Sequence, residues 1–359
     1  MGYWRIRFSD TELGIELLIS KSCTTSGDNA FKVVEVGPRD GLQNEKYIFY
    51  HFQTVGYKRL NCEDQFHVSA FQKILAIEDK LKFIEKLGFC GLKTIEVTSY
   101  VSPKKVPQMA DHAQLIAALQ KQPGISYPVL VPNKKGLEKV VNSGLVRDVA
   151  VFCAASDTFS RKNVNKSMEK SLEEASSVAR AAVEAKMTVR GYVSCVVHCA
   201  YEGKIRPGIV ARLVEKLLDA GCYEISLGDT TGAGGPRSIQ ELLDTLIMSG
   251  VPTTKLAVHF HNTYGQALAN ILVAIEKGIR TADSSIAGLG GCPYSKNATG
   301  NVATEDLVYM LQDLGFETGI KLDDLYDVGQ WICGKLGRFN DSKVAAAHFA
   351  RAENRDFVT

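Results

Sequence analysis

Short runs of apolar, β-branched residues alternate along the chain with longer segments in which apolar residues recur at helical spacing. The short runs predict strands at 31–36, 93–98, 128–131, 148–153, 188–194, 223–227, 256–261 and 281–286. The longer segments predict helices at 74–88, 105–121, 134–143, 168–186, 206–220, 236–249, 264–278 and 303–314. Eight strand–helix repeats indicate an α/β protein whose parallel sheet closes into a (β/α)₈ TIM barrel.

Two further helical segments, 322–335 and 342–352, follow the eighth repeat. We therefore expect an N-terminal extension at 1–30, disordered or used for targeting, before a catalytic barrel at 31–320. The remaining residues, 321–359, are expected to form C-terminal helices that cap the barrel, and a tail.

One segment, 47–72, does not fit the repeat. It is rich in aromatic and polar residues without a clear period, and it separates the first strand from the first helix. Loops between a strand and the next helix usually have about 2–6 residues. We interpret 47–72 as either a lid-like insertion or a disordered excursion.

Composition narrows the class of protein. The formal net charge is +2, which gives no electrostatic reason to expect binding to nucleic acid or to an anionic membrane. The nine cysteines are odd in number and dispersed, which indicates free thiols in a reducing compartment. No apolar run approaches the ~18 residues needed to span a bilayer. The N-terminal residues include Arg5 and Arg7 but also Asp10, Glu12 and Glu16, so a mitochondrial presequence is only weakly indicated.

Two histidines on the predicted seventh strand suggest a metal site. His259 and His261 are two residues apart, so both side chains project to the same face of the strand. Active sites of TIM barrels lie at the C-terminal ends of the strands, where Asp40 and Asn301 also fall. A set of nitrogen and oxygen ligands without thiolate suits Mg²⁺, Mn²⁺ or Zn²⁺. The alternative is a pair of hydrogen-bonded barrel histidines without metal.

Three other residues on this rim have both a chemical and a structural interpretation. Arg39 can bind a carboxylate or an enolate oxygen, or it can hold the barrel through a salt bridge to Glu96. Asp229, at the end of the sixth strand, is either a base or hydrogen-bond orienter or a cap for the next turn. Cys292 lies in a glycine-rich loop and is either a proton donor near the metal or a small buried thiol.

Several of these residues lie in motifs that resemble those of the 3-hydroxy-3-methylglutaryl-CoA (HMG-CoA) lyase family. The resembling segments are 34–45 (VEVGPRDGLQNE), 99–104 (SYVSPK), 106–109 (VPQM), 259–267 (HFHNTYGQA) and 288–294 (GLGGCPY). The resemblance covers roughly 32–347 and is interrupted by 47–72. The histidine motif is shared with related condensing acyltransferases, whereas the loop around Cys292 favours the lyase.

The resemblance implies metal-dependent cleavage of HMG-CoA to acetyl-CoA and acetoacetate, a step of ketone-body formation and leucine degradation. It implies a divalent metal cofactor, Mg²⁺ or Mn²⁺, held by Asp40, His259, His261 and Asn301. The implied catalytic residues are Arg39 for enolate charge, Glu96 to orient Arg39, and Cys292, Asp229 and His259 for acid–base chemistry. We assign substrate binding to Arg39, Ser99, Tyr192 and Asn163.

The expected partner is an acyl-CoA substrate, and the family implies a homodimer. It also implies the mitochondrial matrix, with the cytoplasm as the alternative because the presequence is weak. Two other functions stay open at this point. One is a related condensing acyltransferase, and the other is an inactive barrel or splice variant whose site is perturbed by 47–72.

Overall fold

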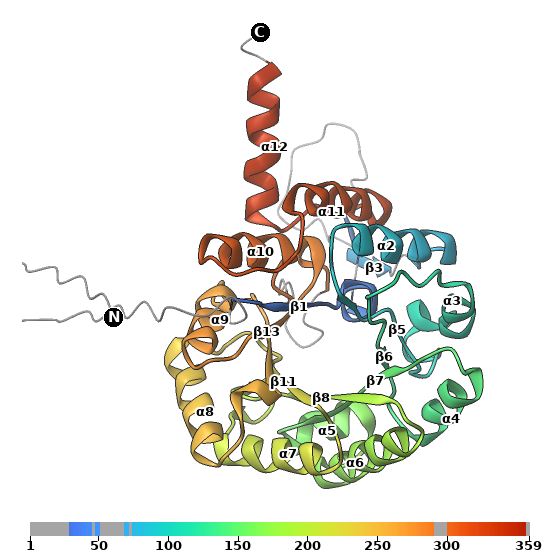
Figure 1. Ribbon diagram of the computed structural model, residues 1–359, viewed down its shortest axis with the longest axis vertical. Helices are drawn as coiled ribbons and strands as arrows, with labels where there is room; N and C mark the ends of the chain where they lie inside the picture. Colours follow the sequence, from blue (N-terminus) through green and yellow to red (C-terminus); the bar gives the residue numbers. More distant parts are fainter. Residues whose placement is uncertain (1–28, 45–46, 51–67, 72–73, 291–299, 357–359) are drawn as a thin grey trace, which may run out of the picture.

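Parallel strands form one curled sheet inside a ring of helices (Figure 1) in the computed structural model, which describes residues 29–44, 47–50, 68–71, 74–290 and 300–356. In sheet order the strands are β4 (Thr94–Ile95), β1 (Lys32–Glu35), β13 (Thr281–Ser284), β12 (Leu256–Phe260), β11 (Glu224–Asp229), β8 (Thr188–Ser194), β7 (Asp148–Ala154), β6 (Val129–Leu130) and β5 (Thr98–Ser99).

The sheet closes on itself because β4 and β5 are two halves of one predicted strand. Thr94 pairs with Val34 of β1 on one side and with Ser126 on the other, and β5 then pairs with β6. The nine short strands therefore occupy eight positions around a barrel, within the residues that the structure describes. The predicted (β/α)₈ fold is confirmed.

The helices of the outer ring lie where the apolar period predicts them. They are α2 (Ile77–Phe89), α3 (His112–Ala118), α4 (Lys134–Ser143), α6 (Met168–Glu184), α7 (Pro207–Asp219), α8 (Pro236–Met248), α9 (Ala267–Glu276) and α10 (Thr304–Asp313). Each buries an apolar stripe against the strands, as α7 does with Val210, Leu213, Val214 and Leu217.

One helix was not predicted. Helix α5 (Asp157–Val164) lies between β7 and α6. It begins at Ser156, whose hydroxyl accepts a hydrogen bond from Phe159 N, and it ends at Asn165 in the left-handed conformation. This short helix places Asn163 beside the barrel mouth.

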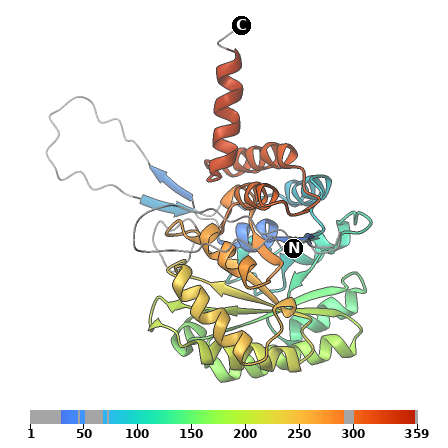
Figure 2. The same cartoon turned by 60° about the vertical axis from the view of Figure 1, so that its left-hand side comes forward.

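The two predicted C-terminal helices are present as α11 (Leu322–Leu336) and α12 (Lys343–Asp356). Helix α11 packs against α2 and α10, whereas α12 contacts α10 and projects away from the barrel (Figures 1 and 2). In the part of the chain that the structure describes, no helix is long and apolar enough to cross a membrane.

The segment 47–72 contains an antiparallel hairpin of β2 (Tyr47–Tyr50) and β3 (Val68–Phe71), with Tyr47 opposite Phe71. Figure 2 shows both strands pointing away from the barrel. The hairpin itself was not predicted, although both strands are rich in aromatic and β-branched residues. Residues 51–67, like most of the expected extension at 1–30, lie outside the described residues.

Candidate active site

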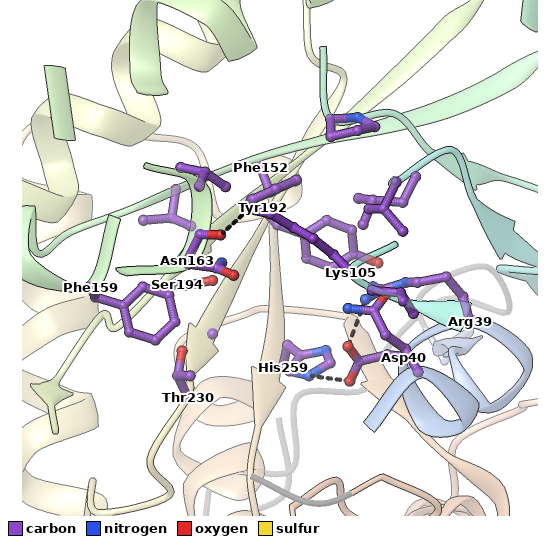
Figure 3. A pocket seen from close by; sticks show the side chains of 18 of the residues that line it. Arg39, Asp40, Lys105, Phe152, Phe159, Asn163, Tyr192, Ser194, Thr230 and His259 are labelled. Carbon is purple, nitrogen blue, oxygen red and sulfur yellow. Dashed lines mark hydrogen bonds and ion pairs between the residues drawn. The ribbon is translucent and has the colours of Figure 1, made fainter. Parts of the chain in front are cut away.

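A pocket of about 470 Å³ opens at the C-terminal ends of the barrel strands. Figure 3 shows Arg39, Asp40 and His259 on one side of it and Phe159 and Asn163 on the opposite side. One wall is therefore charged, and the facing wall carries an aromatic ring and an amide.

Asp40 reaches the pocket from a widened turn directly after β1. This turn is the π-helix η1 (Gly37–Gly41), in which the backbone N–H groups of Arg39, Asp40 and Gly41 all bond to Val36 O at 2.7–3.1 Å. Single π-helical turns are common at functional sites because they displace side chains from the regular path. The turn directs Asp40 and Arg39 together into the pocket wall.

Asp40, His259 and His261 form a cluster that could hold a metal ion. One ligand atom from each residue can be chosen so that all lie within 4.8 Å of one another. His259 Nε2 is 3.8 Å from Asp40 Oδ2, and the two imidazole centroids are 5.3 Å apart. The two histidines therefore share a face, as the alternation along the strand predicts.

The chemical state of this cluster fits a divalent metal. The buried Nδ1 of His261 has no hydrogen-bond partner among the described residues. Burial lowers the pKa of His261 to about 4, so the imidazole is neutral near pH 7. Burial opposes ionisation of Asp40, but the Arg39 guanidinium, together with smaller effects of the neighbouring histidines and Asn301, outweighs it and holds the pKa of Asp40 below its usual range. A neutral His261 beside an ionised Asp40 is the combination of states in which these two groups bind metal.

Asn301 lies directly beside the cluster. It pairs with His261 in an isolated antiparallel bridge, and its Nδ2 donates to Asp40 Oδ2 and to Leu289 O, both at 3.0 Å. The amide therefore turns its nitrogen toward Asp40, whereas metal binding would require the amide oxygen. Its predicted role as an oxygen ligand stays a prediction.

Arg39 is held from two sides. Its Nε donates to Glu96 Oε1, and its Nη1 donates to Asp40 Oδ1 at 2.6 Å. Glu96 is fully buried and its Oε2 accepts from Tyr192 OH at 2.7 Å. The expected salt bridge to Glu96 is present, and the guanidinium also lines the pocket, where its contact with an enolate oxygen stays a prediction.

Asp283, on β13, was missed by the sequence analysis. Its Oδ2 lies 3.1 Å from His259 Nδ1 and its carboxylate accepts from both Nη atoms of Arg190, at 2.7 and 3.1 Å. Burial opposes its ionisation, but Arg190 holds the pKa of Asp283 well below its usual range. An acid within a barrel strand, in the sequence Thr281-Ala282-Asp283-Ser284, was the available signal, because a buried charge requires a partner.

The remaining predicted residues are not all brought together. Asn163 lines the pocket, and its backbone oxygen accepts from Lys105 Nζ at 3.4 Å. Ser99, at the end of β5, is fully buried with an Oγ that has no partner among the described residues. Asp229 is not among the residues that line the pocket, and its Oδ2 accepts from Gly234 N at 2.8 Å, which is a turn-capping contact. Cys292 lies outside the described residues.

Comparison with known proteins identifies the family. The HMGL-like family model matches residues 69–332. A mitochondrial hydroxymethylglutaryl-CoA lyase from Macaca fascicularis is 49% identical over 92% of this chain and 93% of its own length. The chain belongs to the HMG-CoA lyase family. A cytoplasmic HMG-CoA lyase from Rattus norvegicus is 47% identical over 90% of this chain and 86% of its own.

Solved structures of HMG-CoA lyases share the barrel. The enzyme from Pseudomonas aeruginosa matches with a TM-score of 0.80 and 44% identity, covering 90% of this chain and 99% of that one. The enzyme from Acinetobacter baumannii, in complex with coenzyme A and 3-methylmalate, matches with a TM-score of 0.77 and 30% identity over 90% and 97% of the two chains.

Proposed function

We propose that this protein cleaves HMG-CoA to acetyl-CoA and acetoacetate and that it uses a divalent metal, Mg²⁺ or Mn²⁺. The observation that carries the proposal is the cluster of Asp40, His259 and His261 beside Arg39 in the barrel mouth. Curated relatives at about 49% identity over most of the chain are named as lyases of this substrate.

The reaction requires removal of the proton from the C3 hydroxyl group and stabilisation of the enolate that leaves as acetyl-CoA. A bound divalent metal would supply Lewis-acid charge that makes the substrate hydroxyl easier to ionise. The residues that would hold it are Asp40, His259 and His261, with Asn301 as the expected fourth ligand.

Arg39 supplies fixed positive charge where negative charge develops on the enolate oxygen. Glu96 keeps the guanidinium plane in one orientation, and Tyr192 in turn holds Glu96. Such preorganised charge needs no rearrangement during the reaction, so a precise hold on Arg39 contributes directly to the rate.

Proton transfer is assigned to three residues. Cys292 is proposed to protonate the acetyl carbanion, and His259 and Asp229 are further acid–base candidates. Burial raises the pKa of Asp229, which suits an acid, but its carboxylate is engaged with the turn at Gly234. Of the two, His259 is therefore better placed for the reacting atoms, since it lines the pocket.

The substrate is proposed to be an acyl-CoA. The relative from Acinetobacter baumannii binds coenzyme A, which supports this class. Tyr192 and Asn163 line the pocket, and Ser99, at the end of β5, has a buried hydroxyl without a hydrogen-bond partner among the described residues. These three residues, with Arg39, are the proposed substrate contacts.

Assembly and location rest on the family. We propose a homodimer, which sedimentation of the purified chain would test. We propose the mitochondrial matrix, with the cytoplasm as the alternative, because relatives of both locations match this chain. Fractionation of cells that express the full chain would distinguish the two.

The decisive assay is acetoacetate release from HMG-CoA by the purified chain with Mg²⁺ or Mn²⁺, repeated with a chelator. Metal-dependent release is the expected result. Without it, the same assay on a chain lacking 47–72 separates two causes. Recovered activity would identify the insertion as inhibitory, as in the alternative of an inactive variant. If the shortened chain also releases no acetoacetate, the result would count against the lyase reaction, and the condensing reaction should then be assayed.

A further inference from the structure

The buried carboxylate of Glu35 connects two segments of the chain, and each segment carries a predicted metal ligand. Glu35, the last residue of β1, has no solvent exposure. Its Oε1 accepts hydrogen bonds from Gly37 N at 2.8 Å and from Ile286 N at 3.0 Å. Gly37 begins the widened turn that carries Arg39 and Asp40, so one bond of Glu35 holds the base of that turn.

The other oxygen of Glu35 holds the segment that follows Asn301. Glu35 Oε2 accepts from Thr304 Oγ1 at 2.6 Å, and Thr304 Oγ1 also lies 2.9 Å from Ser284 Oγ. Thr304 is the first residue of α10, three positions after Asn301. One carboxyl group therefore connects the chain just before Asp40 with the chain just after Asn301.

The packing around this carboxyl leaves little room for adjustment. A Cβ atom at Gly37 would lie 2.6 Å from Glu35 Oε1, and one at Gly41 would lie 2.8 Å from Ser285 Oγ. Real Cβ contacts do not come this close, so both ends of the Gly37–Gly41 turn fit tightly against Glu35 and the end of β13. A shift of the carboxyl group would be passed on to the turn.

We propose that Glu35 is a positioning residue that keeps Asp40 and Asn301 in register with each other at the metal cluster. The inference rests on the proposed metal-dependent function. Glu35 contacts the backbone and a hydroxyl of the two segments, and it acts on Asp40 and Asn301 only through them. The two side chains are neighbours, with Asn301 Nδ2 3.0 Å from Asp40 Oδ2, and the spacing between them is what Glu35 maintains.

A neutral side chain can make the same bonds. Glutamine keeps one oxygen for the Gly37 and Ile286 donors and places an amide where Oε2 lies. The Thr304 hydroxyl can accept from that amide and donate to Ser284 Oγ, so the connection between the segments survives. Burial raises the pKa of Glu35 to about 7, which agrees with a site that accepts the uncharged form. Glu35→Gln is therefore a conservative variant, whereas Glu35→Ala removes every bond.

The test is equilibrium binding of Mn²⁺ to metal-free protein, followed by the free-ion electron paramagnetic resonance signal. Loss of outer partners of metal ligands usually weakens metal affinity about 10–100-fold. For Glu35→Ala we expect a loss of Mn²⁺ affinity of that size. For Glu35→Gln we expect an affinity within about threefold of wild type, which is a smaller loss than removal of an outer partner usually causes. Val308→Ala, which removes buried apolar volume from α10, is the control that lowers Tm without a change in Mn²⁺ affinity.

If Glu35→Ala fails to fold, Thr304→Val is the second variant. It removes the bond to Glu35 and the contact with Ser284 Oγ, leaves the bonds of Glu35 to Gly37 and Ile286, and is expected to weaken Mn²⁺ binding. Wild-type affinity in Glu35→Ala or in Thr304→Val would overturn the proposal, and so would equal losses in Val308→Ala. A wild-type chain that binds no Mn²⁺ would overturn it too. A wild-type chain that binds Mn²⁺ but releases no acetoacetate would reject the lyase reaction while leaving the role of Glu35 supported by the binding series.

Discussion

His259 Nδ1 lies 3.1 Å from Asp283 Oδ2, and the same carboxylate is clamped by the guanidinium of Arg190. Asp283 therefore fixes the orientation of the His259 ring and leaves Nε2 to face Asp40. Carboxylates in this position orient metal-binding histidines and make them more basic ligands.

We predict that Asp283→Asn weakens Mn²⁺ affinity about 10–100-fold, because the His259 ring loses its charged partner. It also leaves Arg190 with one fewer buried carboxylate, so the free energy of unfolding should fall by several kcal/mol. Glu224→Gln is the matched control, since Glu224 pairs with the same Arg190 and does not contact His259. Denaturant titration and Mn²⁺ binding should separate the two variants, and equal Mn²⁺ affinities would rule out the orienting role.

Asp40→Ala and His259→Ala are each expected to lower metal-dependent acetoacetate formation by more than about 100-fold, beyond the loss typical of outer partners. The reason is that each removes one of the three clustered ligand groups. Ser102→Ala, which lines the same pocket, should keep both Mn²⁺ binding and activity. Near-normal rates in either ligand variant would refute the assignment.

Cys292→Ala should impair turnover more than metal affinity. Loss of a general acid usually costs about 10²–10⁴-fold in rate. The measurement is kcat for HMG-CoA cleavage beside the Mn²⁺ dissociation constant of the same preparation, with Cys153→Ala of the buried strand β7 as the thiol control. Unchanged kcat would remove Cys292 from the mechanism.

Glu305 should make a contribution to stability that falls with rising pH. Burial raises the pKa of Glu305 to about 8 from an ordinary 4.5, so the folded chain binds a proton that the unfolded chain releases across this range. The contribution of Glu305 to the free energy of unfolding should therefore decrease between pH 4.5 and 8, by about 1.4 kcal/mol per pH unit. Glu305→Gln keeps an acceptor for Ala287 N and should flatten the slope by that amount. Parallel slopes in urea titrations at pH 5.5 to 8 would contradict the prediction.

The sequence predicts the fold well because period and spacing are local properties. All eight strand positions and the helices of the ring follow from apolar patterning, and the histidine face follows from alternation along β12. Three features were missed. Helix α5 is too short and polar to show a clear apolar period. The roles of Asp283 and Glu35 depend on contacts with distant segments, with Arg190 and His259 for Asp283 and with Thr304 for Glu35.

The same limit applies to Asp229. Its place at the end of β11 suits both an acid and a turn cap. The hydrogen bond from Gly234 N shows that the carboxylate makes the capping contact, and its role as an acid stays a prediction. The position of a residue in the sequence predicts that it lies at the rim of the barrel, but its hydrogen-bond partners are known only from the structure.

The hairpin of β2 and β3 begins and ends at facing residues. Tyr47 and Phe71 are paired, and Cα atoms of paired residues on antiparallel strands lie about 5 Å apart. The two ends of the hairpin therefore lie close together, whatever lies between. Swapping the intervening residues for a tight turn, or for a fluorescent reporter whose own termini are close, should leave the catalytic mouth intact, which makes this hairpin a natural graft point for a sensor built on the enzyme.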